Sequence, residues 1–163
     1  MRRSIIVFSA LAIFSSCADQ PSSPAATSTD TMSHESHAMA QESAPALEAV
    51  PDNAKVFFRN IKTGDLLTSP FKVEMGVENM SVDTANGKIK PASGHHHILI
   101  GLDSVAAGTV VPKDSVHLHF GNAQTSTEIK LPSGTYKLTL QFADALHRSY
   151  GSRLTNSVIV KVK

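Results

Sequence analysis

The chain of 163 residues contains one cysteine, no tryptophan and two tyrosines. A single cysteine excludes an internal disulfide framework and a zinc site built from several thiolates. The 15 lysine and arginine residues nearly balance the 14 aspartate and glutamate residues, and they form no basic stripe. Nucleic-acid binding, which requires such a stripe, is therefore not expected.

The chain also lacks an apolar run of the roughly 20 residues that a membrane-spanning helix needs. Its longest run, residues 5–14, follows two arginines and suits the core of a signal peptide. Small residues then lead into Cys17, and residues 14–17 (Phe-Ser-Ser-Cys) resemble a bacterial lipobox. The resemblance implies a lipoprotein signal peptide at residues 1–16, lipidation of Cys17 and a membrane anchor made of acyl chains. An ordinary secretory signal with a chance cysteine is the alternative.

We therefore expect a protein of the bacterial cell envelope, lipid-anchored on the periplasmic or cell-surface side. Once Cys17 is lipidated, the mature chain has no free thiol, which excludes thiolate nucleophiles and thiolate-ligated copper. Residues 17–50 are rich in Ser, Ala, Thr and Pro and are expected to form a disordered tether. Two histidines flanked by methionines at 32–39 are a loose copper-capture segment or, as we favour, part of a polar linker.

The remaining residues, 51–163, show the period of two that is typical of half-buried strands. Phe71, Val73, Met75 and Val77 alternate with polar side chains, and the pattern recurs at 136–142 and 158–162. Further strand-like runs lie at 56–61, 96–102 and 116–120, separated by turn residues. About seven short strands without helical periodicity predict an all-β domain, an immunoglobulin-like antiparallel β-sandwich. An up-and-down barrel is the alternative.

Eight histidines are the unusual feature of the composition. Side chains alternate across a strand, so His95 and His97 should share the face opposite the core, about 7 Å apart. The same reasoning places His117 and His119 on one face of the next strand, with Val116, Leu118 and Phe120 inward. If the two strands are neighbours, up to four imidazoles meet. A thiol-free cluster of nitrogen ligands prefers Cu(II) or Zn(II).

Two residues of the loop before the last strand extend this candidate site. His147 is a possible further ligand, and Asp144 is placed to accept a hydrogen bond from an imidazole and orient it. The alternative interpretation is a structural cluster in which imidazoles bind one another and the nearby loops. The protein would then be a non-catalytic adhesion or scaffold module that binds an envelope protein or a glycan.

Catalysis has little support in the sequence. It contains no Gly-x-Ser-x-Gly elbow, phosphate-binding loop or His-Glu-x-x-His helix. We therefore expect a protein that is not an enzyme, and a copper–zinc oxidoreductase is the alternative left open by the histidines.

Several motifs together resemble a known family. They are Gly-His-His-His at 94–97 with the apolar residues that follow, His-x-His-Phe-Gly-x-x-Gln-Thr at 117–125, and the segments 69–73, 131–134 and 142–147. Over roughly residues 56–162 the chain resembles the bacterial domain-of-unknown-function family DUF4399. The resemblance implies a secreted or periplasmic β-domain with clustered polar motifs, and it implies no particular activity.

Overall fold

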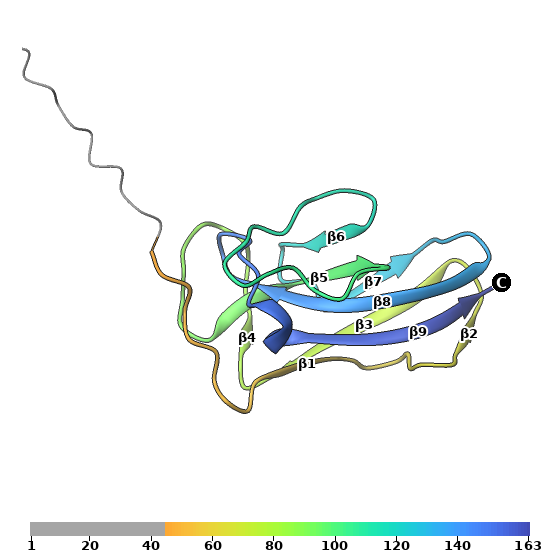
Figure 1. Cartoon of the computed structure of the whole chain (residues 1–163), viewed down its shortest axis with the longest axis horizontal. Coiled ribbons are helices and arrows are strands. Elements are labelled where there is room, and N and C mark those ends of the chain that lie inside the picture. Colours follow the sequence, from red (N-terminus) through yellow and green to blue (C-terminus); the bar gives the residue numbers. More distant parts are fainter. Residues whose placement is uncertain (1–44) are drawn as a thin grey trace, which may run out of the picture. The chain divides into compact units, whose positions relative to one another are not determined.

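The computed structural model describes residues 45–163 (Figure 1). The expected signal peptide, the lipidation site Cys17 and the Met/His segment at 32–39 lie outside these residues, so they stay predictions. Within the described part of the chain, no helix has the length and apolar character needed to cross a membrane.

Residues 45–163 form nine strands and one short 3-10 helix, which confirms the all-β prediction. The strands are β1 (Lys55–Phe58), β2 (Leu66–Leu67), β3 (Phe71–Glu78), β4 (Ser81–Val82), β5 (Ser93–Ile100), β6 (His117–Phe120), β7 (Ser126–Ile129), β8 (Gly134–Ala143) and β9 (Thr155–Val162), with the helix η1 (Gly151–Leu154) before β9.

The strands form two sheets that pack as a sandwich (Figure 1). The smaller sheet has the order β1-β3-β7, and the larger has the order β2-β9-β8-β5-β4, with β6 also paired to β5. Most pairs are antiparallel as expected, whereas the two-residue strands β2 and β4 pair in parallel with β9 and β5. Strand β5 lies inside the larger sheet, hydrogen-bonded to β6 and to β8.

Alternation in the sequence explains the core between the sheets. In β9 the three valines are buried, and Ile159 and Lys161 between them are exposed. Strands β3 and β8 also contribute every second side chain to the core between the sheets, because alternate side chains of a strand point to one face. The fully buried aliphatic and aromatic side chains that result are Val73, Met75, Ile98, Leu138, Leu140, Phe142 and Val160.

The outer face of the larger sheet is also covered. Thr139 and Gln141 alternate with the core residues of β8 and point away from the core, yet both are fully buried. The segment 101–116 lies over them: the Thr139 hydroxyl donates to the Leu102 carbonyl at 2.7 Å, and the Val105 N–H donates to Gln141 at 3.0 Å. Polar side chains on this face therefore lie in an enclosed environment rather than in water.

Three sequence predictions need correction. Strands β2, β4 and β7 are additional to the predicted runs. Val116, expected to face the core, is 37% exposed, and Leu102 at the end of the predicted run 96–102 is exposed to the same extent. The ordered chain begins before residue 51, because residues of the expected tether, Leu47 and Val50, pack against the core.

Candidate metal centre

The Gly-His-His-His motif is the start of β5, where the chain passes very close to β8. A Cβ atom on Gly94 would lie 2.3 Å from the carbonyl oxygen of Ala143, so only glycine fits there without moving the backbone. The three histidines that follow are all buried. His96 packs edge-on against Phe142 of the core, with ring centroids 5.0 Å apart. His95 and His97 therefore point to the opposite face, as the alternation predicted.

Strand β6 brings a third imidazole to that face. The register pairs His97 directly with His119, which confirms that the two histidine-bearing strands are neighbours. Their ring centroids are 5.0 Å apart, and the His119 ring is 5.1 Å from that of His95. Gly121 makes room for this ring, because a Cβ atom there would lie 2.4 Å from Cε1 and Nε2 of His119.

These three histidines converge on a single point. One ring nitrogen from each of His95, His97 and His119 lies within 4.8 Å of the other two. The Nε2 atoms of His95 and His97 are 2.9 Å apart, so in the absence of an ion they form a hydrogen bond. Nitrogens bound to one Zn(II) at about 2.0–2.1 Å lie roughly 3 Å from each other, so this spacing suits a shared ion.

His147 lies beside the group. It follows β8 in a left-handed backbone conformation, with φ of 64°, which few residues other than glycine adopt. This conformation directs the imidazole toward the cluster, 4.8 Å from the His119 ring and 5.0 Å from the His95 ring between centroids. His147 is not among the three residues whose nitrogens meet within 4.8 Å, so it stands at the edge of the group.

The structure does not bring His117 into the group. Its ring turns to Asp114, and Nδ1 lies 2.8 Å from the carboxylate oxygen Oδ1. The same oxygen accepts the backbone N–H groups of Val116 and His117, each at 2.9 Å. A carboxylate three residues before the histidine therefore holds this ring at the start of β6, and that spacing is visible in the sequence.

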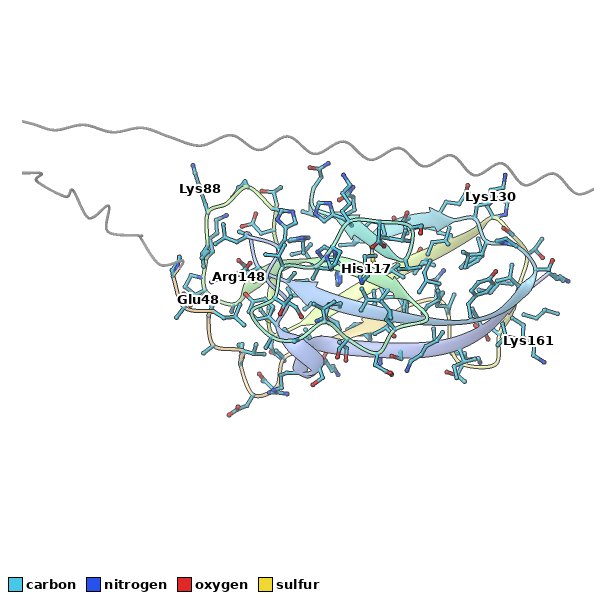
Figure 2. All side chains as sticks on the ribbon, turned by 45° about the horizontal axis from the view of Figure 1, so that its top comes forward. Glu48, Lys88, His117, Lys130, Arg148 and Lys161 are labelled. Carbon is cyan, nitrogen blue, oxygen red and sulfur yellow. The ribbon has the colours of Figure 1, made fainter. Side chains whose placement is uncertain are left out.

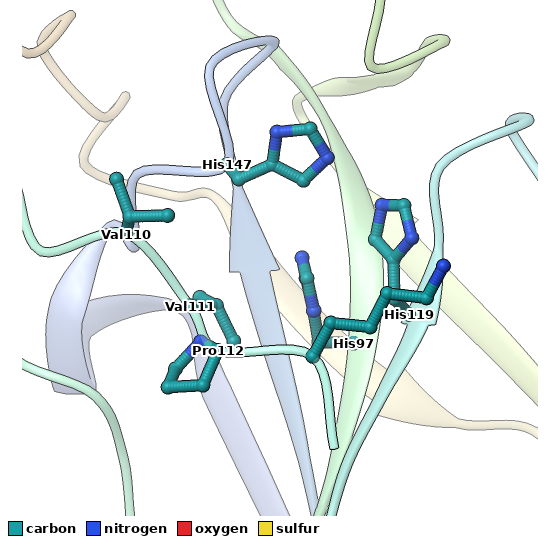
Figure 3. Close-up of a pocket in the computed structure, with 7 residues that line it drawn as sticks. His97, Val110, Val111, Pro112, His119 and His147 are labelled. Carbon is teal, nitrogen blue, oxygen red and sulfur yellow. The ribbon is translucent and has the colours of Figure 1, made fainter.

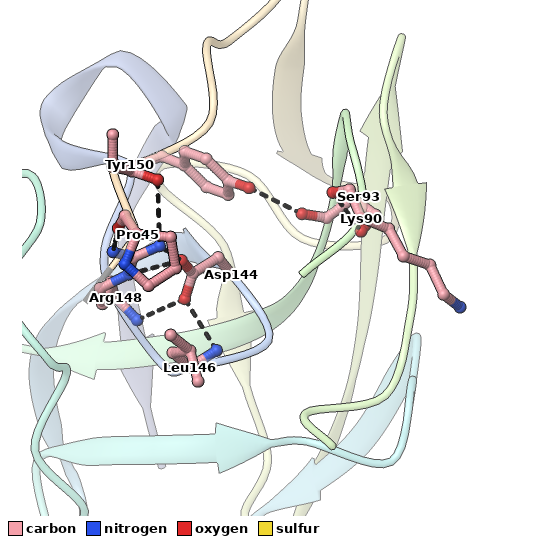
Figure 4. Close-up of polar contacts among 8 residues, drawn as sticks. Pro45, Lys90, Ser93, Asp144, Leu146, Arg148 and Tyr150 are labelled. Atoms are coloured by element: carbon pink, nitrogen blue, oxygen red, sulfur yellow. Dashed lines mark hydrogen bonds and ion pairs between the residues drawn. The ribbon is translucent and has the colours of Figure 1, made fainter. Parts of the chain in front are cut away.

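Asp144 has a different partner from the one we expected (Figure 4). Its carboxylate accepts the Arg148 guanidinium Nε at 2.7 Å, and the backbone N–H groups of Leu146 and Arg148 at 2.9 Å. Among the described residues, Asp144 itself makes no hydrogen bond to an imidazole. Asp144 therefore shapes the loop that carries His147 rather than orienting a ring directly.

Burial keeps the central imidazoles neutral. Loss of water around His95 lowers its pKa to about 3, and the nearby His119 and His147 rings add to this by disfavouring a second positive charge. Burial, and then the neighbouring imidazoles, lower the pKa of His97 to about 2. The pKa of His119 is lowered for the same reasons. Neutral rings have a free lone pair, which is the form that binds a metal ion.

The cluster also contains buried nitrogens without hydrogen-bond partners. Within residues 45–163, Nδ1 of His95, Nδ1 of His97 and Nε2 of His119 have none. A buried polar atom without a partner costs about 1–3 kcal/mol. The one hydrogen bond between these rings, which joins Nε2 of His95 and Nε2 of His97 at 2.9 Å, therefore leaves three buried ring nitrogens of the cluster without a partner.

A pocket of about 430 Å³ opens beside the cluster (Figure 3). Three imidazoles form one side, those of His97, His119 and His147. The other side comes from the loop before β6. It consists of Val110, Val111, Pro112 and Lys113.

Val111 of the apolar wall is hydrogen-bonded to the loop that carries His147. The Val111 N–H donates to the His147 carbonyl at 2.9 Å, and the Val111 side chain is buried. The sequence does not indicate this wall, because residues 108–114 show no periodicity that would tell which side chains point inward.

Comparison with known proteins gives one family. The family model Domain of unknown function (DUF4399) matches residues 73–163, which is more than half of the chain. No curated protein and no solved structure matches the chain significantly. The matched region contains β5, β6 and the loop after β8, and thus every histidine of the cluster. The chain belongs to the DUF4399 family.

Proposed function

We propose that this protein is a non-catalytic, cell-envelope lipoprotein whose β-sandwich binds Cu(II) or Zn(II) through His95, His97 and His119. The observation that carries the proposal is the convergence of three ring nitrogens within 4.8 Å on an enclosed face of the sheet. Lipidation of Cys17 would hold the domain at the membrane.

The chemistry of the donors supports these two ions. All three ligands are imidazole nitrogens, and the nearby carboxylates of Asp144 and Asp114 bind Arg148 and His117 instead. Ca²⁺ and Mg²⁺ prefer oxygen ligands, whereas imidazole suits copper and zinc. Three protein ligands leave at least one coordination position for water, another ligand or His147.

The first prediction tests the metal site by thermal unfolding. The protein tested is the full chain without a tag. Cys17→Ser removes the thiol, and His34→Ala and His37→Ala remove the two histidines that lie outside residues 45–163. A metal ion at a hundred times its dissociation constant stabilises the folded state by about 2.7 kcal/mol. We therefore expect Zn(II) or Cu(II) to raise the melting temperature by several degrees.

Strand β6 supplies a matched pair of variants. His119→Ala should abolish the rise in melting temperature, whereas His117→Ala, two residues away, should retain it. If neither ion stabilises the parent protein, the proposal is wrong. A rise that survives His119→Ala together with His97→Ala would also reject it, because the ion would then bind elsewhere.

A further inference from the structure

The pocket beside the cluster has the features of a site for a small anion. Its volume of about 430 Å³ falls in the range of roughly 300–1,000 Å³ that small-molecule sites occupy. This is far more space than one metal-bound water needs. The imidazoles of His97 and His119 lie on its wall, so a ligand in the pocket would touch a metal ion held by them.

With the proposed divalent ion bound, the charge around the pocket would be positive. Neutral imidazole ligands leave the full charge of a divalent ion in place, and Lys113 adds a second positive group to the lining. The charge on Lys113 contributes to the lowered pKa of His119, so its field acts on the cluster. Among the described residues, none of those that line the pocket is acidic.

The opposite wall is apolar. Val110, Val111 and Pro112 face the imidazoles across the pocket (Figure 3), and Val110 is 58% exposed although it is a large aliphatic residue. Such a surface favours a ligand with a hydrocarbon part. A pocket with a metal ion and a lysine beside aliphatic side chains matches an amphiphilic anion.

We propose that the pocket binds a small organic carboxylate, with its charged end at the metal ion and Lys113 and its hydrocarbon end against Val110, Val111 and Pro112. The inference rests on the proposed metal site and adds an open coordination position to it. A carboxylate has two oxygens, so one can bind the ion while the other faces the lysine.

The second prediction tests this with the Cu(II)-loaded full chain described above. Butyrate should shift the copper visible absorption and the electron paramagnetic resonance spectrum in a saturable way. Butyramide has nearly the same shape without the charge, so it should cause no shift. Acetate should bind about fifteenfold more weakly than butyrate, because it lacks two methylene groups that contact the apolar wall.

Two lysine variants test the charge in the pocket. Lys113→Ala should weaken butyrate binding about fivefold, since it removes one positive charge next to the carboxylate. Lys161→Ala removes an exposed charge on β9 and should leave butyrate binding unchanged.

The outcomes separate the two proposals. Copper that binds in a His119-dependent manner but gives no spectral response to butyrate would overturn the anion site alone. An equal response to butyramide would show that the pocket does not require the charge of a carboxylate and would overturn the anion site. Full butyrate affinity in Lys113→Ala would overturn the role of Lys113. Absence of copper binding by the parent protein would overturn the metal site itself.

Discussion

Gly121 shows how a residue without a side chain can control a candidate ligand. The glycine follows His119 by two positions, and the edge of the imidazole occupies the space where a Cβ atom would be. The contact is with ring atoms at the end of a side chain, so a larger residue would rotate the imidazole rather than displace the strand. The position of the ring therefore depends on a neighbour that binds nothing.

The third prediction follows from this contact. Gly121→Ala should weaken Zn(II) binding about tenfold while the melting temperature of the metal-free protein changes little. Isothermal titration and thermal unfolding measure the two effects. Asn122→Ala is the control, because the hydrogen bond of Asn122 to Gln124 uses its backbone N–H. Unchanged zinc affinity in Gly121→Ala would contradict the idea that packing against the glycine positions the ring.

Residue spacing predicted much of the candidate site, but not all of it. A period of two placed His95, His97 and His119 on the correct faces, since strand geometry alone determines the direction of each side chain. His117 obeys the same period, but the Asp114 carboxylate turns its ring away. Local hydrogen bonds of this kind compete with alternation and are easily overlooked when only periodicity is considered.

The loop between β8 and η1 depends on one buried ion pair. The Asp144 side chain is 1% exposed and that of Arg148 is 11% exposed. Arg148 also donates to the backbone carbonyls of Pro45 and Ala46, so the guanidinium joins the His147 loop to the first described residues (Figure 4). The pair thus connects two segments that are a hundred residues apart in the sequence.

The fourth prediction concerns this pair. Arg148→Ala should lower the free energy of unfolding by about 3 kcal/mol or more, because it leaves a buried carboxylate without its partner. Chemical denaturation measures the loss. Arg153→Ala is the matched control: Arg153 also donates to a backbone carbonyl, that of Pro51, but it is exposed and should cost less than about 1 kcal/mol. Equal effects of the two variants would contradict this role of Arg148.

The longer elements were predictable, whereas the shorter ones were not. Strands β3, β8 and β9 have eight or ten residues, enough for alternation to be evident. Strands β2 and β4 have two residues each, too few to show any period. The cover formed by 101–116 depends on hydrogen bonds to Thr139 and Gln141, far away in sequence. Enclosure of the histidines was therefore not predictable from either strand alone.

The labelled lysines of the domain are scattered over its surface and form no charged patch together. Figure 2 shows the side chains of Lys88, Lys130 and Lys161 at separate places on the domain, and all three are exposed. This agrees with the nearly balanced charge of the sequence, +1 at pH 7. The acid sensitivity of the molecule should instead depend on groups in its interior.

The fifth prediction is that the metal-free protein loses stability as pH falls from about 6.5 to 4.5. Burial lowers the pKa values of His95, His96 and His97 to about 3, 4 and 2, whereas unfolded histidine titrates near 6.5. The unfolded chain therefore binds more protons in this interval, so the free energy of unfolding decreases with decreasing pH. Denaturation curves at several pH values measure the slope.

A core variant provides the control for that slope. His96→Leu removes one buried imidazole and retains an apolar side chain of similar size, so the loss of stability between pH 6.5 and 4.5 should become less steep. A free energy of unfolding that is constant over this interval, or that rises toward acid, would show that the buried imidazoles do not titrate as described.

Three consecutive histidines give β5 an unusual property. A slip of one residue against β8 would turn every side chain to the other side of the sheet. His96 would then be the one imidazole on the face where His95 and His97 now meet. The rings of His95 and His97 would lie among the aliphatic side chains of the core. An ion that requires both His95 and His97 would bind one alignment and not its neighbour. Binding of the proposed ion would therefore stabilise the observed register of β5 relative to a register shifted by one residue.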